Sequence, residues 1–159
     1  MPSFGGEGAI AETTTWLTPP HVLKALGHFD LDPCSPIDRP WDTAGHHYTI
    51  EDDGLMQPWF GRVWLNPPYA HEAWPFMEKM AVHQNGIALL FARTETKGFQ
   101  DLVFPYASGM LFLRGRLKFH RLDGSLASTS QAPSVLIAYG DAEVEVLRES
   151  QLAGRLVRL

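Results

Sequence analysis

The apolar residues of this 159-residue chain fall into short runs and one helically spaced stretch. Residues 87–91 (IALLF) are uniformly apolar, which is typical of a strand that is covered on both faces. Between residues 71 and 84, apolar side chains recur at helical spacing, which predicts a helix with one face on the core. Shorter patterns predict further strands at residues 29–32, 47–50, 62–65, 110–113, 117–120 and 135–139.

Prolines, glycines and polar clusters separate these elements. Pro19 and Pro20 suit the first turn of a short helix that ends at Gly27, and further helices are predicted at residues 97–104 and 149–157. Residues 1–12 have no periodicity and are predicted to be a flexible tail, and residues 34–45 are predicted to be a loop. The polar stretch 123–133 is rich in Ser and Thr and is long enough to be a mobile loop.

The order of the elements predicts the fold class. Strands separated by helices, followed by hairpin-like strands, are typical of a three-layer α/β domain whose sheet is mostly parallel with antiparallel strands near the C-terminus. In such sheets, ligands collect where the parallel strands end. Two predicted strand ends carry unusual residues, namely Asp32-Pro33-Cys34-Ser35-Pro36 and Asn66-Pro67-Pro68-Tyr69.

Length and composition narrow the class of protein. A chain of 159 residues, 45% of them hydrophobic, can form one domain with a sizeable core, which we expect at residues 13–159 without a separate recognition domain. No run of about 18 apolar residues and no secretory signal is found, so we expect a cytoplasmic protein without a membrane span. The single cysteine, Cys34, excludes a disulfide framework.

The net charge of -5 argues against a nucleic-acid partner, but the charge is unevenly distributed. Residues 1–80 hold four Lys or Arg against eleven Asp or Glu, whereas residues 93–121 hold six against two, a net charge of +4. Phe and Tyr residues are interleaved with these cations. A basic face of this kind can follow phosphates, although ordinary solvated strand ends would give the same count.

The tetrapeptide Asn66-Pro67-Pro68-Tyr69 lies between a predicted strand and a predicted helix. Its two prolines fix two φ angles and remove two N–H donors, so the loop presents carbonyl groups as acceptors. A planar ring with an exocyclic amine would fit: the amine donates to the Asn66 side-chain oxygen and the Pro67 carbonyl, and the ring stacks on Tyr69. These hydrogen bonds bend the amine toward tetrahedral geometry and free its lone pair to attack an electrophile. In other contexts the same string is a plain strand terminator.

Several motifs, in their order, resemble those of the compact, Dam-like DNA adenine methyltransferases of phages and prophages. This family transfers a methyl group from S-adenosylmethionine to the exocyclic amine of adenine. The similarity covers roughly residues 12–140. The matching segments are WLTPP at 16–20, FDLDPC at 29–34, DDGL at 52–55, QPW at 57–59, VWLNPPY at 63–69, ARTET at 92–96, GRLKF at 115–119 and APS at 132–134.

The resemblance implies a compact, truncated class I S-adenosylmethionine-dependent methyltransferase fold, which is Rossmann-like. Many methyltransferases carry a glycine-rich loop after the first strand, where this chain has residues 32–36. About 33 residues separate Asp32 from Asn66, where the full plan has two more helix–strand units. We therefore expect the helices on one face of the sheet to be shortened or missing.

The resemblance also implies roles for individual residues. Asn66, Pro67 and Tyr69 would form the pocket for the target amine, and Pro68 would stiffen it. The target adenine would be flipped out of the duplex or presented in a single strand. Asp53 could equally cap a turn, and Trp16 could be a core residue. The implied cofactor contacts are Trp16, Thr18, Pro19, Asp32, Pro33, Cys34 and Asp53, and the implied DNA contacts are Arg93, Arg116 and Lys118.

Other functions fit the sequence less well. The histidines and Cys34 match no common metal-site spacing, so no metal is expected, and Cys34 lacks a histidine partner for nucleophilic catalysis. RNA adenine, DNA cytosine or a protein glutamine as the methyl acceptor stays open, as does a cofactor- or DNA-binding remnant without activity. Residues 123–133 carry one ionisable side chain and are the segment expected to read bases, so broad sequence specificity is predicted.

Overall fold

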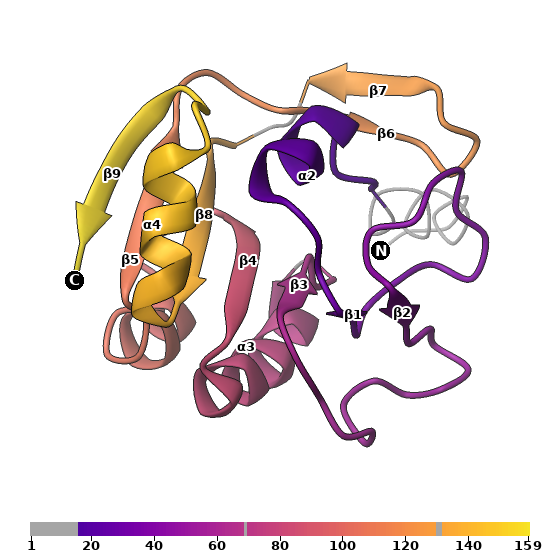
Figure 1. Cartoon of the computed structure of the whole chain (residues 1–159), viewed down its shortest axis with the longest axis horizontal. Helices are drawn as coiled ribbons and strands as arrows, with labels where there is room; N and C mark the ends of the chain where they lie inside the picture. Colours follow the sequence, from indigo (N-terminus) through magenta and orange to yellow (C-terminus); the bar gives the residue numbers. More distant parts are fainter. Residues whose placement is uncertain (1–15, 69, 130–131) are drawn as a thin grey trace, which may run out of the picture.

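The computed structural model of the chain describes residues 16–68, 70–129 and 132–159, and its centre is a seven-stranded sheet with the order β2-β1-β3-β4-β8-β5-β9 (Figure 1). The strands of this sheet are β1 (Leu31–Asp32), β2 (His46–His47), β3 (Val63–Leu65), β4 (Gly86–Phe91), β5 (Gly109–Leu113), β8 (Ser134–Tyr139) and β9 (Gly154–Arg158). The first four strands are parallel, β8 is antiparallel to both β4 and β5, and β9 is antiparallel to β5. The predicted α/β class, with a mostly parallel sheet and antiparallel strands near the C-terminus, is confirmed.

Helices cover both faces of the sheet (Figure 1). One face carries α2 (Pro20–Leu26) and α4 (Asp141–Glu149), and the other carries α3 (Ala73–His83) and the π-helical turn η2 (Phe99–Val103). Alternate residues of β3 divide between the two cores, because Val63 and Leu65 pack in the α3 core and Trp64 packs in the α2 core. Among the described residues, no helix is long and apolar enough to cross a membrane.

The helix ends follow from local sequence. Helix α2 has Pro20 in its first turn and ends at Gly27, whose φ of 85° is a left-handed conformation that suits glycine. Helix α3 follows a 3₁₀ turn, η1 (Ala70–Glu72), and ends at Gln84 with φ 57°. The helices predicted at 71–84 and after Pro19 are therefore confirmed to within two residues.

The prediction of a loop over residues 123–133 is wrong for its centre. Leu126–Thr129 forms β7, which pairs antiparallel with β6 (Lys118–His120) in a separate two-stranded sheet. Asp123 and Gly124, with φ 88° at the glycine, make the turn, and the Asp123 carboxylate accepts hydrogen bonds from the N–H and hydroxyl of Ser125. An Asp-Gly turn between residues that tolerate extended backbone produces a hairpin.

The predicted helix over residues 149–157 is also wrong. Helix α4 ends at Glu149, and the chain then forms the edge strand β9 on β5. Gly154 permits this approach, since a Cβ there would overlap the carbonyl oxygen of Phe112. Leu156 packs on the core while Arg155 is exposed, which is the alternation of a strand.

The expected loss of helices is seen between β1 and β3, where the described residues 33–62 contain no helix. Individual side chains hold this segment. The Tyr48 hydroxyl donates to the Pro58 carbonyl and Trp59 Nε1 donates to the Gly54 carbonyl, each at 2.8 Å. From helix α3, Lys79 Nζ donates to the carbonyl groups of Leu55 and Gln57 at 2.8 and 2.5 Å.

An ion pair joins the segment before β3 to helix α4. Arg62, just before β3, places Nη2 2.8 Å from Oε1 of Glu143 on α4, and its Nε also donates to that carboxylate. The side chains are 18% and 5% exposed, so the pair is largely removed from water. The guanidinium also lies 4.2 Å from the centre of the Phe29 ring and donates to the His28 carbonyl.

Candidate functional site

The predicted strand ends meet at one edge of the sheet. Leu31 of β1 pairs in parallel with Val63 of β3, and Val63 pairs with Gly86 of β4. The residues that follow these strands therefore leave the sheet on the same side. Asp32 and Asn66, which lie 34 positions apart in the sequence, are thus brought to neighbouring strand ends.

The Asn66 side chain is held by the segment that precedes α2. Its Nδ2 atom donates to the Trp16 carbonyl at 3.2 Å and to the Thr18 hydroxyl oxygen at 3.3 Å. A carbonyl can only accept, so the atom that faces Trp16 must be the amide nitrogen. The Asn66 Oδ1 atom has no hydrogen-bond donor among the described residues and remains an available acceptor.

The two prolines continue this loop. Pro67 is buried and Pro68 is half-buried, and the chain then enters η1 and α3. Tyr69 lies outside the described residues, so the predicted stacking face stays a prediction. Pro19, on the neighbouring segment, is buried, and its carbonyl accepts the Val22 N–H at the start of α2.

Asp32 is a buried carboxylate at the end of β1, with 3% of its surface exposed. One oxygen accepts the Cys34 N–H at 3.0 Å, and the other accepts the Thr43 hydroxyl. Burial raises the pKa of Asp32 to about 6, and the bonds from Thr43 and Cys34, with the charge of Arg39, oppose the rise. Asp32 thus ties the loop after β1 to the segment that leads into β2.

The Cys34 thiol lies in the same loop. Burial raises its pKa well above the usual range, and the nearby carboxylates of Asp32 and Glu72 raise it further. A thiol in this environment stays protonated at neutral pH and is a poor nucleophile. Cys34 therefore contributes its main-chain N–H, rather than thiol chemistry, to the order of the loop.

The acidic turn packs directly against this loop. Gly54 has no side chain to interfere, and a Cβ at that position would overlap the Pro33 carbonyl oxygen. The Asp52 carboxylate caps the turn by accepting the Thr49 N–H at 2.8 Å. Asp53 is exposed and has φ 57°. The sequence left open that Asp53 caps a turn. In the structure, the adjacent Asp52 caps this turn.

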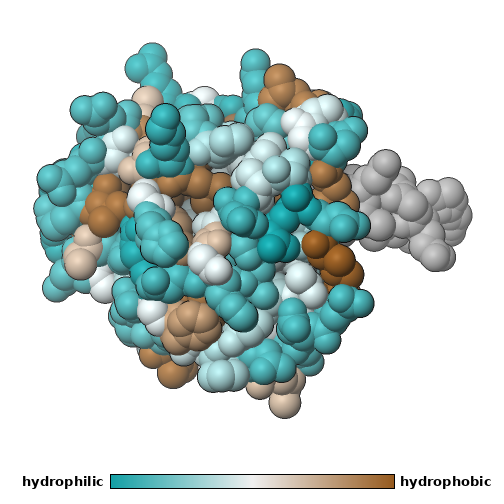
Figure 2. Space-filling model, turned by 45° about the vertical axis from the view of Figure 1, so that its right-hand side comes forward, coloured by the Kyte–Doolittle hydropathy of each residue, from teal (hydrophilic) through white to brown (hydrophobic). Residues whose placement is uncertain are grey.

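The predicted DNA contacts are exposed. Arg93 follows β4, with its guanidinium 5.7 Å from the Phe91 ring centre, and Arg116 and Lys118 lie where the chain enters the β6–β7 hairpin. The hairpin is fastened to the segment that holds Asn66, because Leu17 and His120 exchange two main-chain hydrogen bonds of 2.9 Å. On the face shown in Figure 2, hydrophilic residues predominate and hydrophobic ones form small, separate patches.

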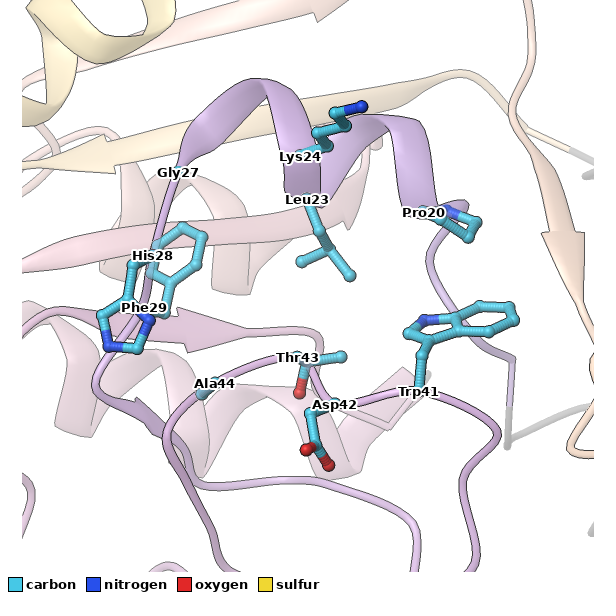
Figure 3. Close-up of a pocket in the computed structure, with 10 residues that line it drawn as sticks. All are labelled: Pro20, Leu23, Lys24, Gly27, His28, Phe29, Trp41, Asp42, Thr43 and Ala44. Atoms are coloured by element: carbon cyan, nitrogen blue, oxygen red, sulfur yellow. The ribbon is translucent and has the colours of Figure 1, made fainter.

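A pocket of about 370 Å³ lies between α2 and residues 41–44 (Figure 3). Leu23 and Trp41 face it from opposite sides, and Thr43, whose hydroxyl holds Asp32, lines it as well. The indole nitrogen of Trp41 is buried without a hydrogen-bond partner among the described residues. Neither Trp41 nor Thr43 belongs to a motif that the sequence singled out, and Thr43 is separated from Asp32 by eleven positions.

Comparison with known families gives the class of protein. The model of the family described as DNA N-6-adenine-methyltransferase (Dam) matches residues 9–146. The match covers most of the 159 residues, and the chain belongs to this family. It is a DNA adenine methyltransferase, as the motif order suggested. No curated protein and no solved structure matches the chain.

Proposed function

We propose that the chain methylates the exocyclic amine of adenine in DNA, with S-adenosylmethionine as the methyl donor, and that Asn66, Pro67, Pro68 and Tyr69 form the target pocket. The observation that supports this pocket is the orientation of the Asn66 amide. Its nitrogen is occupied by Trp16 and Thr18, and its oxygen is left to accept. The proposal includes a truncated class I, Rossmann-like fold, for which parallel strands followed by β8 between β4 and β5 are the support.

The pocket acts by positioning and by hydrogen bonding. The target amine donates one hydrogen to Asn66 Oδ1 and the other to the Pro67 carbonyl. Both bonds become stronger as the amine gains positive charge in the transition state, so they favour the transition state over the ground state. Holding the amine in line with the methyl group removes most of the entropic barrier. The extra proton leaves after methyl transfer, so no strong base is required.

The residues after β1 and in the acidic turn fit the cofactor by their chemistry. S-adenosylmethionine supplies an activated methyl group on a sulfonium cation. A carboxylate oxygen has two lone pairs, so Asp32 can accept a further hydrogen bond beside those from Cys34 and Thr43, and its charge favours a cation. Asp53, exposed next to the Pro33 loop, would hold a ribose hydroxyl or an adenine amine.

DNA would contact the exposed cations beside this edge. Arg93, Arg116 and Lys118 are proposed to bind phosphates, which positions the duplex without reading its sequence. The target base must leave the stack, because its amine cannot be reached inside a duplex.

The test of the pocket is Asn66→Ala. We expect methyl transfer to DNA to fall by about 10²–10³-fold, with nearly unchanged binding of S-adenosylmethionine by calorimetry. Asn85→Ala is the matched control, because Asn85 is exposed at the opposite edge of the sheet, before β4. Near-normal transfer of labelled methyl groups by the Asn66→Ala variant would overturn the assignment of the pocket.

The substrate is tested separately. The wild-type protein is incubated with labelled cofactor and with DNA, RNA or protein, and the methylated DNA is digested to nucleosides. We expect N6-methyladenine in DNA. Label recovered in methylcytosine, in RNA or in protein glutamine would contradict the proposed substrate while leaving the pocket open to test.

A further inference from the structure

Thr18 is one of the most deeply buried polar residues in the described part of the chain, with 1% of its surface exposed. Its hydroxyl oxygen accepts a hydrogen bond from Asn66 Nδ2, and the Trp16 carbonyl accepts another. The two hydrogens of the Asn66 amide are therefore both occupied by one short segment, residues 16–18, which we call the strap.

The strap matters because an asparagine amide has two non-equivalent ends. Rotation by 180° would place Oδ1 against the Trp16 carbonyl, where two acceptors would face each other. It would also direct Nδ2 toward the target amine, where two donors would meet. With both of its hydrogens bound to the strap, the amide keeps its oxygen on the side where the described residues supply no donor.

The strap is itself fixed from its other side. The N–H of Leu17 donates to the His120 carbonyl, and the N–H of His120 donates to the Leu17 carbonyl, both at 2.9 Å. The His120 ring contacts the Trp41 ring edge-on, with 5.2 Å between their centres. The position of the Asn66 amide is thereby linked to the β6–β7 hairpin through Leu17.

We propose that Thr18 is a positioning residue for methyl transfer. Its hydroxyl, with the Trp16 carbonyl, holds the Asn66 amide in the orientation in which Oδ1 accepts a hydrogen bond from the target amine. The inference rests on the proposed function, because it requires Asn66 to be the acceptor. It gives Thr18 a role in the orientation of the target pocket instead of the cofactor contact that the resemblance implied.

The first test compares Thr18→Val with Thr18→Ser. Valine keeps the shape of threonine and removes the acceptor, so we expect kcat to fall by about 10-fold, the equivalent of one lost hydrogen bond, while the Kd for S-adenosylmethionine and the KM for DNA stay within about twofold. Serine keeps the hydroxyl and should restore most of kcat. A Thr18→Val variant with weaker cofactor binding and normal kcat would overturn the inference in favour of a cofactor contact.

The second test repeats Thr18→Val in the Asn66→Ala background, which has no side-chain amide for Thr18 to hold. Within that background, Thr18→Val should change the residual kcat by less than about twofold. An equal loss in both backgrounds would show that Thr18 acts through general packing and would overturn the inference.

A third measurement does not depend on activity. In wild-type protein labelled with ¹⁵N, the Asn66 side-chain NH₂ group should give two distinct, slowly exchanging proton signals, and Thr18→Val should shift or broaden one of them. Unchanged signals would contradict the proposed bond. If Asn66→Ala is active, the proposed target pocket fails, and the role of Thr18 fails with it; if Asn66→Ala is inactive and Thr18→Val is normal, the role of Thr18 alone fails.

Discussion

The two halves of the sheet are built differently. Strands β4, β8 and β5 are five or six residues long, and every residue of β8 is buried. Strands β1 and β2 have two residues each and β3 has three. In the long-strand half, long ladders maintain the structure, and the cores on the two faces of the sheet extend across both halves. In the short-strand half, single side chains such as Tyr48 and Lys79 hold loops through main-chain carbonyl groups.

The candidate site lies in the short-strand half, although the long strands form its support. Asp32 is the last residue of β1 and Asn66 follows β3, and both side chains are fixed by partners distant in the sequence, Thr43 for Asp32 and Thr18 for Asn66. Reactive groups placed on loops can be arranged by individual bonds, while the adjacent strands keep the loops in position. Substitutions should therefore affect global stability in one half and local order or activity in the other.

The largest effect on the free energy of unfolding is expected at the ion pair between Arg62 and Glu143, which joins the two halves. Glu143→Ala leaves the Arg62 guanidinium, 18% exposed, without its partner, and should lower the free energy of unfolding by about 3–5 kcal/mol. Urea titration at neutral pH measures this loss. Glu145→Ala is the control on the same helix, because the Glu145 side chain is 50% exposed in its pairs with Arg148 and Arg158 and should cost less than about 1 kcal/mol. Equal losses of stability in the two variants would show that the pair of Arg62 and Glu143 contributes no more than an exposed ion pair.

The second-largest effect on stability is expected at Asp32. Its pKa of about 6, against 3.8 in the unfolded chain, means that the folded state binds the proton more tightly, so its contribution to stability is full below about pH 4 and is lost as pH rises through 6. Asp32→Asn removes this loss, and its amide oxygen can accept the Cys34 N–H while its NH₂ group donates to the Thr43 hydroxyl oxygen. The stability of this variant relative to wild type should rise by about 2 kcal/mol between pH 4 and 7. A difference that stays constant over this range would contradict the raised pKa.

The Asp32→Asn variant also tests whether Asp32 contributes to cofactor binding. If Asp32 faces the cationic cofactor as proposed, affinity for S-adenosylmethionine should increase from pH 5 to pH 7 in wild type, because the carboxylate becomes ionised. In Asp32→Asn, this increase should disappear. A gain in stability at neutral pH together with a loss in cofactor affinity is the trade-off expected of a functional buried charge.

The smallest effect is expected for Lys79→Met. The variant removes the hydrogen bonds to Leu55 and Gln57, and should lower the stability of the loop by about 1–2 kcal/mol. Because few strand contacts depend on this loop, the effect should be local: faster hydrogen exchange in residues 48–62, with little change in β4 and β8. Lys97→Met, which removes an exposed pair with Asp101, is the control. A uniform increase in exchange would argue against a separately held loop.

The sequence predicted the elements whose pattern depends on local burial. The uniformly apolar β4 and the helical spacing before it are read directly from residues 71–91, and glycine and proline place the ends of α2. The predictions failed near the C-terminus, where the available pairing partner determines the secondary structure. Residues 154–158 become a strand because β5 offers an edge and Gly154 allows the close approach. No periodicity within that segment contains this information.

The candidate site was predicted to a similar extent. The motif order pointed to Asn66 and Asp32, and the structure places both at neighbouring strand ends. The motif order could not point to Thr43 as the partner of Asp32, or to Thr18 as the partner of Asn66, because those contacts depend on loop paths rather than on spacing. The cofactor, phosphate and base contacts stay predictions.

The bridge between Leu17 and His120 has a consequence for protein synthesis. The strap is synthesised about a hundred residues before its partner on β6, and β4 is synthesised before β8, which begins at Ser134 and covers one of its edges. A nascent chain therefore carries an apolar central strand with an open edge until β8 has been synthesised, a state prone to aggregation. Ribosome pausing before residue 134 would prolong that exposure, and the contact between the strap and β6 can form only after His120 has been synthesised.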